Sequence, residues 1–314
     1  MTYTALVTGG AGFIGSHLVD HLIKKNYQLT VIDDLSAGNL DNLKQIKDSI
    51  KFFKGDIANI KFIKDVFKEE FDFIFHIAAN ASVPISVNKP RLDFSSNAIG
   101  TFNLLEASKD SGTKKFIYAS TAAVYGEPKY TPIDEKHPLA PISPYGASKL
   151  AGEACGFSFV KAYGIRFTSM RIFNCIGPRQ PRYVIYDFLN KLLKNKTELE
   201  ILGTGENVRD FIYVDDVCNA FIQSAEKKIS DGEAYSLGTG KYVTITQLAN
   251  QILENLNLDK TKLKYTGFSW KGDVKVLIAD NSKALKHFNL KITPLADALD
   301  HEIKWFQENV SKIM

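Results

Sequence analysis

The sequence predicts an α/β fold in which helices cover both faces of a doubly wound parallel sheet. Two observations carry this prediction. Short apolar segments alternate with amphipathic segments through the first half of the 314-residue chain, and a glycine-rich turn separates the first strand from the first helix. Such alternation is typical of βαβ units, whose successive strands run parallel.

The first element is an apolar strand at residues 5–7, followed at once by Gly10-x-Gly12-x-x-Gly15 and an amphipathic helix over 13–25. Glycines at this spacing allow a tight turn and let a pyrophosphate approach the helix N-terminus, as in a Rossmann fold. We therefore expect a dinucleotide-binding turn that includes Gly9, Gly12, Phe13, Ile14 and Gly15.

A second strand at 28–32 ends in Asp33, which lies about 18 positions after Gly15, where an acceptor for a ribose 2′-hydroxyl is expected. The following loop, residues 34–39, contains no Arg or Lys that could pair with a 2′-phosphate. The sequence therefore favours NAD over NADP as cofactor.

Further strands are expected near 51–53, 73–76, 116–120 and 166–172, and helices near 60–70, 92–111 and 144–163. Residues that follow strand ends line the ligand crevice of such a sheet. Asp56, followed by Ile57, could contact the adenine, although a surface turn explains Asp56 equally well. The backbone of Ala78 and Ala79 could contact the cofactor, whereas His76 is expected to be a packed core residue.

The helix near 144–163 has Ser143 as a candidate N-cap and Pro144 as its first residue. Tyr145 and Lys149 are four residues apart and share one face of this helix. The helix N-terminus and the lysine charge both favour phenolate, so we expect the pKa of Tyr145 to be lowered toward neutrality. A phenol of that kind can take a proton from an alcohol.

Thr121, at the end of a predicted strand, could hydrogen-bond the same substrate oxygen. Tyr and Lys at this spacing are often ordinary surface residues, so the pair alone is weak evidence. Together with the glycine turn, it predicts a reversible oxidation at an alcohol carbon.

Beyond residue 173 the pattern is less regular, with helices expected at 183–194, 246–256 and 295–306 and a strand at 199–202. We expect a Rossmann domain over 1–172 and a smaller α/β substrate lobe over 173–314. Part of 206–235 is expected to return to the first domain.

The composition is that of a globular protein, with 45% hydrophobic and 24% charged residues and a net charge of +4. The lysines are dispersed and indicate a solvated surface, so no nucleic-acid partner is expected. No apolar run is long enough for a membrane span. The three cysteines lack metal or redox spacing, which indicates no metal site and favours a reducing cytoplasm.

These motifs resemble the extended short-chain dehydrogenase/reductase family, and within it the nucleotide-sugar epimerases and dehydratases. The resemblance runs along the whole chain, and the segments that carry it are the glycine turn, 55–57, 76–79, 120–126, 145–149, 173–174, 203–205, 208–210 and 272–274.

The resemblance implies roles for individual residues. Thr121, Tyr145 and Lys149 match the catalytic triad, and Lys149 would also hold the nicotinamide ribose of NAD. The residues that would bind a nucleotide-sugar substrate are Ser82, Thr121, Asn174, Arg209 and Asp273. A surface ion pair with Asp210 is the alternative for Arg209. Members are usually homodimers joined through the helices near 92–111 and 144–163. The first of these helices carries an apolar stripe, which could form the dimer interface or pack into the core of one subunit: Phe94, Ala98, Phe102 and Leu105.

Departures from the family pattern narrow the expected reaction. The 4,6-dehydratases carry Asp-Glu directly after the threonine, where this chain has Ala122 and Ala123. The decarboxylases' glutamate is also missing, so the resemblance implies a 4-epimerase, with UDP-glucose and UDP-galactose as the expected pair.

Two further departures concern the substrate. Many relatives have Arg-Pro where this chain has Trp270-Lys271, which leaves the nucleotide open. Leu277 replaces a frequent Tyr and could admit an N-acetyl sugar.

Two alternatives remain at this point. The first is another epimerase, a dehydrogenase or a reductase of the same family, and stoichiometric NADH release would indicate a dehydrogenase. The second is a non-catalytic NAD-sensing regulator, which would have no reason to keep Thr121, Tyr145 and Lys149 together.

Overall fold

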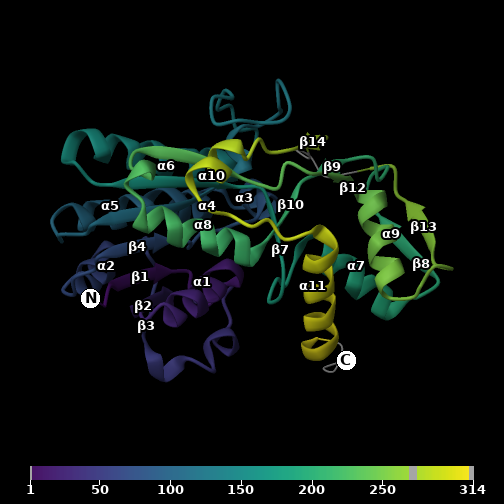
Figure 1. The fold of residues 1–314 in the computed structure, drawn as a ribbon, viewed down its shortest axis with the longest axis horizontal. Coiled ribbons are helices and arrows are strands. Elements are labelled where there is room, and N and C mark those ends of the chain that lie inside the picture. Colours follow the sequence, from purple (N-terminus) through teal and green to yellow (C-terminus); the bar gives the residue numbers. More distant parts are fainter. Residues whose placement is uncertain (1, 269–273, 311–314) are drawn as a thin grey trace.

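The centre of the molecule is a sheet of seven parallel strands in the order β11-β6-β5-β4-β1-β2-β3 (Figure 1). The computed structural model describes residues 2–268 and 274–310. The strands of the sheet are β1 (Thr4–Thr8), β2 (Gln28–Asp33), β3 (Ile50–Lys54), β4 (Phe73–His76), β5 (Lys115–Thr121), β6 (Phe167–Ile172) and β11 (Glu233–Leu237). The predicted doubly wound parallel sheet is confirmed.

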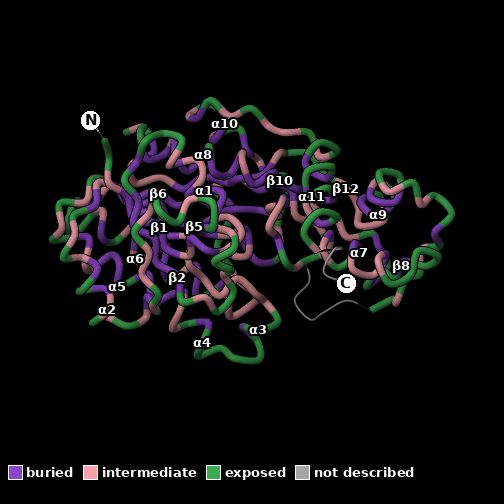
Figure 2. The backbone as a smooth tube through the Cα atoms, turned by 90° about the horizontal axis from the view of Figure 1, so that it is seen from below, coloured by how far each residue is buried: buried purple, intermediate pink, exposed green. Residues whose placement is uncertain are grey.

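Both faces of the sheet are covered, and consecutive residues of β1, which point to opposite faces, are apolar and buried. Ala5 and Val7 of β1 join one buried cluster, which includes helices α1 (Phe13–Lys24) and α8 (Val214–Glu226). Leu6 joins the opposite cluster. The helices on that side are α2 (Ile60–Val66), α5 (Gly100–Lys109) and α6 (Pro144–Tyr163). Figure 2 shows the strands as largely buried tubes inside these helices.

The second half of the chain builds a smaller lobe at the other end of the molecule from α2 and α5 (Figure 1). Its main elements are α7 (Tyr183–Lys194), α9 (Ile245–Asn255), α11 (Leu295–Asn309) and the parallel pair β8 (Glu198–Ile201) and β13 (Lys262–Tyr265). Further short elements are β7 (Asn174–Ile176), β9 (Val208–Arg209), β10 (Phe211–Tyr213), β12 (Val243–Thr244) and β14 (Val276–Leu277). Helix α10 (Ser282–His287) lies back over the sheet, against β11 (Figure 1).

The chain crosses back from this lobe to the sheet. Helix α8 packs against α1, and β11 then pairs with β6 as an additional parallel strand. We propose a domain boundary near residue 172, where β6 ends, with α8 and β11 belonging to the first domain. None of the described helices combines the length and the apolar character needed to cross a membrane.

The helix predicted near 92–111 is confirmed as a helical segment, but it is not a regular α-helix throughout. This region contains α4 (Pro90–Phe94), a π-helical turn η3 (Ser95–Ile99) and then α5. A further helix, α3 (Val83–Asn88), was not predicted, and α2 ends at Val66 instead of reaching residue 70. The short 3₁₀ turns are η1 (Leu40–Leu43), η2 (Lys47–Ser49), η4 (Ala122–Val124) and η5 (Lys228–Ser230). By contrast, α6 and α7 have the predicted bounds.

Candidate active site

The glycine turn connects the end of β1 to α1 with almost no space for side chains. Gly9 has φ +70°, and a Cβ atom there would lie 2.8 Å from the backbone of Ala78. A Cβ atom on Gly15 would lie 2.0 Å from the carbonyl oxygen of Gly9. Gly12 is the N-cap of α1 and supplies no side-chain acceptor, so the amides at this helix terminus remain available to an anion.

Asp33 is held rigidly at the end of β2. Its carboxylate accepts hydrogen bonds from the amides of Ala11 at 2.9 Å and Leu35 at 2.8 Å. Burial raises the pKa of this carboxyl group, although both amides act to lower it. The side chain is thereby fixed beside the glycine turn, where it could accept a hydrogen bond from a ribose hydroxyl.

One cavity of about 1120 Å³ runs from the glycine turn into the C-terminal lobe. It brings together every predicted site residue that the structure describes: Gly9, Gly12, Phe13, Ile14, Gly15, Asp33, Asp56, Ile57, Ala78, Ala79, Ser82, Thr121, Tyr145, Lys149, Asn174 and Arg209. Asp273, Trp270 and Lys271 lie outside the described residues. The carboxylate of Asp56 accepts from the amide of Ala58 at 2.8 Å in an exposed turn. Asp56 is therefore both a surface-turn residue and a residue that lines the cavity.

Tyr145 is placed by the N-terminus of α6. The Ser143 hydroxyl accepts from the amide of Gly146 at 3.1 Å, as expected for an N-cap. The expectation of a lowered pKa for Tyr145 is wrong, because burial raises it. Tyr183 adds to the increase, whereas a hydrogen bond with Thr121 acts in the opposite direction. The loss of hydration around the phenolate outweighs the helix terminus.

Lys149 lies one helical turn further along, with only 1% of its surface exposed. Its Nζ atom has no hydrogen-bond partner among the residues that the structure describes. Burial lowers the pKa of this ammonium group to about 7, although Asp93 and Glu153 act to raise it. Lys149 and the glycine turn line the same cavity. A buried amine without a partner there fits a ligand whose hydroxyl groups can accept its hydrogen bonds. The residues present therefore fit a dinucleotide.

Thr121 ends β5 and begins the short turn η4, where its Oγ1 atom accepts from the amide of Ala123 at 3.2 Å. The neighbouring Ser120 also lines the cavity, and its buried hydroxyl has no partner within the described part of the chain. Ser120 was not among the predicted site residues. Its position beside Thr121 in the sequence was the only available signal.

His76 is a core residue, as predicted. Its Nδ1 atom is 2.7 Å from the hydroxyl of Thr8, and its Nε2 atom is 2.8 Å from the hydroxyl of Thr101. Complete burial lowers the pKa of this imidazole well below its usual value, so it is neutral near pH 7. It therefore ties β1 and α5 to the sheet as an uncharged group.

The far end of the cavity contains the residues predicted for substrate. Asn174 on β7 donates from Nδ2 to the carbonyl oxygen of Asp210 at 2.9 Å. Arg209 on β9 donates to the carbonyl oxygen of Val208 at 2.8 Å. The carboxylate of Asp210 is fully buried and accepts hydrogen bonds from Thr239, Gly240 and Ala279. Asp210 thus holds the loops around Arg209 together.

Tyr183 is a second residue that sequence reasoning missed. It lines the cavity at the start of α7, and its hydroxyl donates to the carbonyl oxygen of Ala81. The residue adopts φ +75°, which is unusual for a bulky side chain. This contact joins the C-terminal lobe to the segment after β4, and no sequence pattern signals it.

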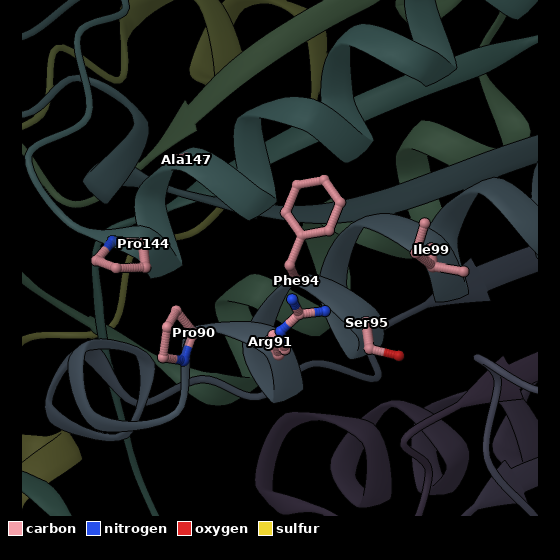
Figure 3. A pocket seen from close by; sticks show the side chains of 7 residues that line it. All are labelled: Pro90, Arg91, Phe94, Ser95, Ile99, Pro144 and Ala147. Carbon is pink, nitrogen blue, oxygen red and sulfur yellow. The ribbon is translucent and has the colours of Figure 1, made fainter.

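A smaller pocket of about 600 Å³ lies outside the site, between α4, η3 and the start of α6. Figure 3 shows the side chains of Pro90, Phe94 and Pro144 around it. The predicted apolar stripe does not face one way: Phe94 and Phe102 are exposed, whereas Ala98 and Leu105 are buried. The exposed members could therefore serve an interface, and the buried members belong to the core.

Comparison with known proteins agrees with this geometry. The NAD dependent epimerase/dehydratase family matches residues 5–238. A putative UDP-glucose 4-epimerase of Methanocaldococcus jannaschii is 40% identical over 248 residues, 77% of this chain and 79% of the relative. A UDP-glucuronate 4-epimerase of Thermodesulfobacterium geofontis is 34% identical over 320 residues, 98% of this chain and 97% of the relative.

Among solved structures, the UDP-glucose 4-epimerase of Thermotoga maritima with UDP-glucose has a TM-score of 0.91 at 38% identity. The match covers 98% of this chain and 99% of that chain. The chain therefore belongs to the NAD-dependent epimerase/dehydratase family.

Proposed function

We propose that this protein is an NAD-dependent 4-epimerase of a nucleotide sugar, with UDP-glucose and UDP-galactose as its substrate pair. One observation carries the proposal. Thr121, Tyr145 and Lys149 line the cavity, and the two residues directly after Thr121 that also line it are Ala122 and Ala123. Alanine cannot move a proton, so positions 122 and 123 supply no acid–base pair for dehydration beside the groups for oxidation.

In this proposal Tyr145 removes the proton from O4 of the sugar, and Thr121 orients that oxygen through its hydroxyl. Lys149 supplies positive charge beside the phenol. NAD, when bound, supplies a reversible two-electron oxidant and a positive charge that favours the Tyr145 phenolate. Tyr145 then returns the proton after the flat 4-keto sugar has turned its other face toward the same groups, which inverts C4.

The sugar must turn while its nucleotide stays bound, so the diphosphate needs a firm anchor. We assign this role to Arg209 on β9 and Asn174 on β7, which both line the cavity. A guanidinium group is well suited to a diphosphate because it offers several donors in one plane. The cavity volume of about 1120 Å³ leaves space for both a dinucleotide and a nucleotide sugar.

A second candidate is a 4-epimerase of an N-acetylated nucleotide sugar. Leu277 on β14 lines the cavity, and its modest size favours a larger substituent on the sugar ring. We further propose that the protein is a homodimer and is cytoplasmic. The cytoplasmic assignment rests on its free cysteines, Cys155, Cys175 and Cys218, which fit a reducing compartment.

The test is to incubate the purified protein with UDP-glucose, without added NAD, and to follow the products by proton NMR. Appearance of UDP-galactose supports the proposal and a retained cofactor. Turnover of UDP-N-acetylglucosamine alone supports the second candidate. In a parallel reaction with NAD added in excess, accumulation of free NADH in proportion to the substrate oxidised supports a dehydrogenase. Absence of turnover of any nucleotide sugar, despite tight NAD binding, supports a regulator.

A further inference from the structure

A buried polar cluster includes Ser148, the neighbour of Lys149 on α6. Its centre is Asp93 on α4, whose side chain is fully buried. The carboxylate accepts a hydrogen bond from the Ser148 hydroxyl at 2.5 Å and another from Nδ2 of Asn97 at 3.1 Å. Ser148 directly precedes Lys149 on α6, so Asp93 is attached to the residue next to the proposed catalytic lysine.

Asn97 connects the same cluster to the cofactor side of the cavity. It lies in the π-helical turn η3, a kind of distortion that is frequent at functional sites. Its Nδ2 atom donates to the hydroxyl of Ser148 at 3.0 Å, and its Oδ1 atom accepts from the amide of Asn80 at 2.8 Å. Asn80 follows β4 and lines the cavity. The cluster therefore joins α4, η3, α6 and the end of β4.

The charges around Lys149 single out Asp93. Two carboxylates act on this lysine, those of Asp93 and Glu153. Glu153 forms an ion pair with Arg171, with 2.5 Å between Oε1 and Nη2, so its negative charge is largely compensated. Asp93 is bonded to a hydroxyl group and an amide group, which are neutral, so no ion pair compensates its charge among the described residues. Burial raises the pKa of the Asp93 carboxyl group, whereas the Ser148 hydrogen bond, the Lys149 charge and the Asn97 hydrogen bond act to lower it.

The other titratable groups that face Lys149 carry no charge near pH 7. His76 on β4 is kept neutral by burial, and the phenol of Tyr118 on β5 has its pKa raised well above the usual value. The pKa of Tyr145 is raised as well, and Asp93 contributes to that increase. Asp93 is thus the uncompensated anion among the described neighbours that act on the ammonium group of Lys149.

We propose that Asp93 is a positioning residue whose carboxylate holds the Lys149 ammonium group in its charged form beside the Tyr145 phenol. Burial alone favours the neutral amine, which could not stabilise a phenolate. The charge of Asp93 opposes this effect, and hydrogen bonds from both Ser148 and Asn97 hold the carboxylate in place, so that either one can keep it there. The inference rests on the proposed catalytic roles of Tyr145 and Lys149, but it concerns a proton equilibrium that can be measured without substrate.

The experiment measures the titration of Lys149 directly, by NMR of protein with ¹⁵N and ¹³C at the lysine side-chain ends. The Lys149 signal is assigned by its disappearance in Lys149→Met. Asp93→Asn removes the charge and can keep the hydrogen bonds. The asparagine amide group can donate to the Ser148 hydroxyl, which then donates to its second acceptor, the carbonyl oxygen of Tyr145 at 3.0 Å. Ser148→Ala is the matched control, which removes the hydrogen bond and keeps the charge.

We expect the Lys149 midpoint to fall by roughly one pH unit or more in Asp93→Asn and to stay near the native value in Ser148→Ala. If the protein epimerises, the alkaline limb of its kcat profile shifts to lower pH in Asp93→Asn alone. An unchanged midpoint in Asp93→Asn, or an equal shift in Ser148→Ala, overturns the proposal. Asp93→Ser is a second neutral variant should Asp93→Asn fail to fold. Absence of epimerase activity would contradict the proposed function. The NMR titration would still decide whether Asp93 holds Lys149 in its charged form.

Discussion

The Nζ atom of Lys149 lies 4.2 Å from the centre of the Tyr118 ring, and the Tyr118 hydroxyl donates to the main-chain oxygen of the same lysine at 3.0 Å. One residue of β5 therefore contacts both the charged end and the backbone of Lys149. An ammonium group over an aromatic face is attracted by the negative π face of the ring. This contact partly replaces the hydrogen bonds that the structure does not provide for Nζ within its described residues.

Substitutions at Tyr118 separate these two contacts. Tyr118→Phe keeps the ring and should lower the free energy of unfolding by about 0.5–1.5 kcal/mol with little change in kcat. Tyr118→Leu removes the ring face, so we expect a clear loss of kcat at neutral pH as well. Urea unfolding and the epimerase assay check both results. Equal losses of kcat in the two variants would show that the ring does not matter.

Tyr145→Phe should lower kcat by a factor of roughly 10²–10⁴, because it removes the proposed acid–base group. The glycine turn and Asp33 are unchanged, so the amount of NAD that copurifies should be close to native. Turnover is measured by NMR and bound NAD by absorbance after denaturation. Near-native turnover would exclude Tyr145 as the group that moves the proton.

Gly9, in the turn after β1, can be compared with Gly112, which follows α5 and has nearly the same backbone conformation. Gly9 has φ +70° and Gly112 has φ +69°, but a Cβ atom would lie 2.8 Å from Ala78 at the first position and in open space at the second. Gly9→Ala should abolish NAD retention, because the backbone of the cradle must move apart. Gly112→Ala should cost only the strain of a left-handed alanine, about 1–2 kcal/mol, and leave NAD bound. Similar NAD content in the two proteins would contradict the close-packing argument.

The sequence predicted the features that are local in the chain. The period of the apolar residues, the Ser143 cap and the spacing from Gly15 to Asp33 were enough to predict α6, the sheet and residues that line the cavity at the glycine turn. The pKa of Tyr145 could not be predicted in this way, because the burial that raises it comes from elements distant in sequence, including Tyr183. The π turn at Asn97 was missed for the same reason, since its partners Asn80 and Ser148 lie on other elements.

The C-terminal helix carries a carboxyl group that makes stability depend on pH. Glu302 on α11 is 1% exposed, and its Oε2 atom accepts from the amide of Gly177 at 2.9 Å. Its Oε1 atom has no partner among the described residues, and burial raises the pKa to about 8. The folded protein therefore keeps this proton at pH values where the unfolded chain has lost it.

Because only the folded protein keeps this proton, its stability falls as pH rises. The stability associated with Glu302 is fully present below its unfolded pKa of 4.5 and falls as pH rises toward 8, by about 1.4 kcal/mol per pH unit. Glu302→Gln should remove this slope, so the variant gains stability relative to the native protein between pH 5 and 8. Urea unfolding at both pH values checks the prediction. Parallel changes in the two proteins would mean that Glu302 is ionised in the fold.

The proposed homodimer can be tested on exposed aromatic side chains of the helical segment near 92–111. Phe94 and Phe102 are 50% and 40% exposed, although both belong to the helical segment near 92–111. Exposed aromatic residues that cluster on one surface often mark an interface. The double variant Phe94→Glu with Phe102→Glu should give a monomer in sedimentation experiments, because each glutamate would place a charge inside the interface.

Ile229 provides the matched control, since it is 55% exposed and lies on the turn η5, outside the helical segment near 92–111. Ile229→Glu should leave the oligomeric state unchanged. Asp93 and Asn97 lie on the same helical segment as Phe94. Loss of the interface should therefore also loosen the hydrogen-bonded cluster of Asp93, Asn97 and Ser148 and reduce kcat in the monomer. A monomeric double variant with native kcat would show that the cluster is held by the fold of one subunit alone, and a native protein that is already monomeric would refute the dimer.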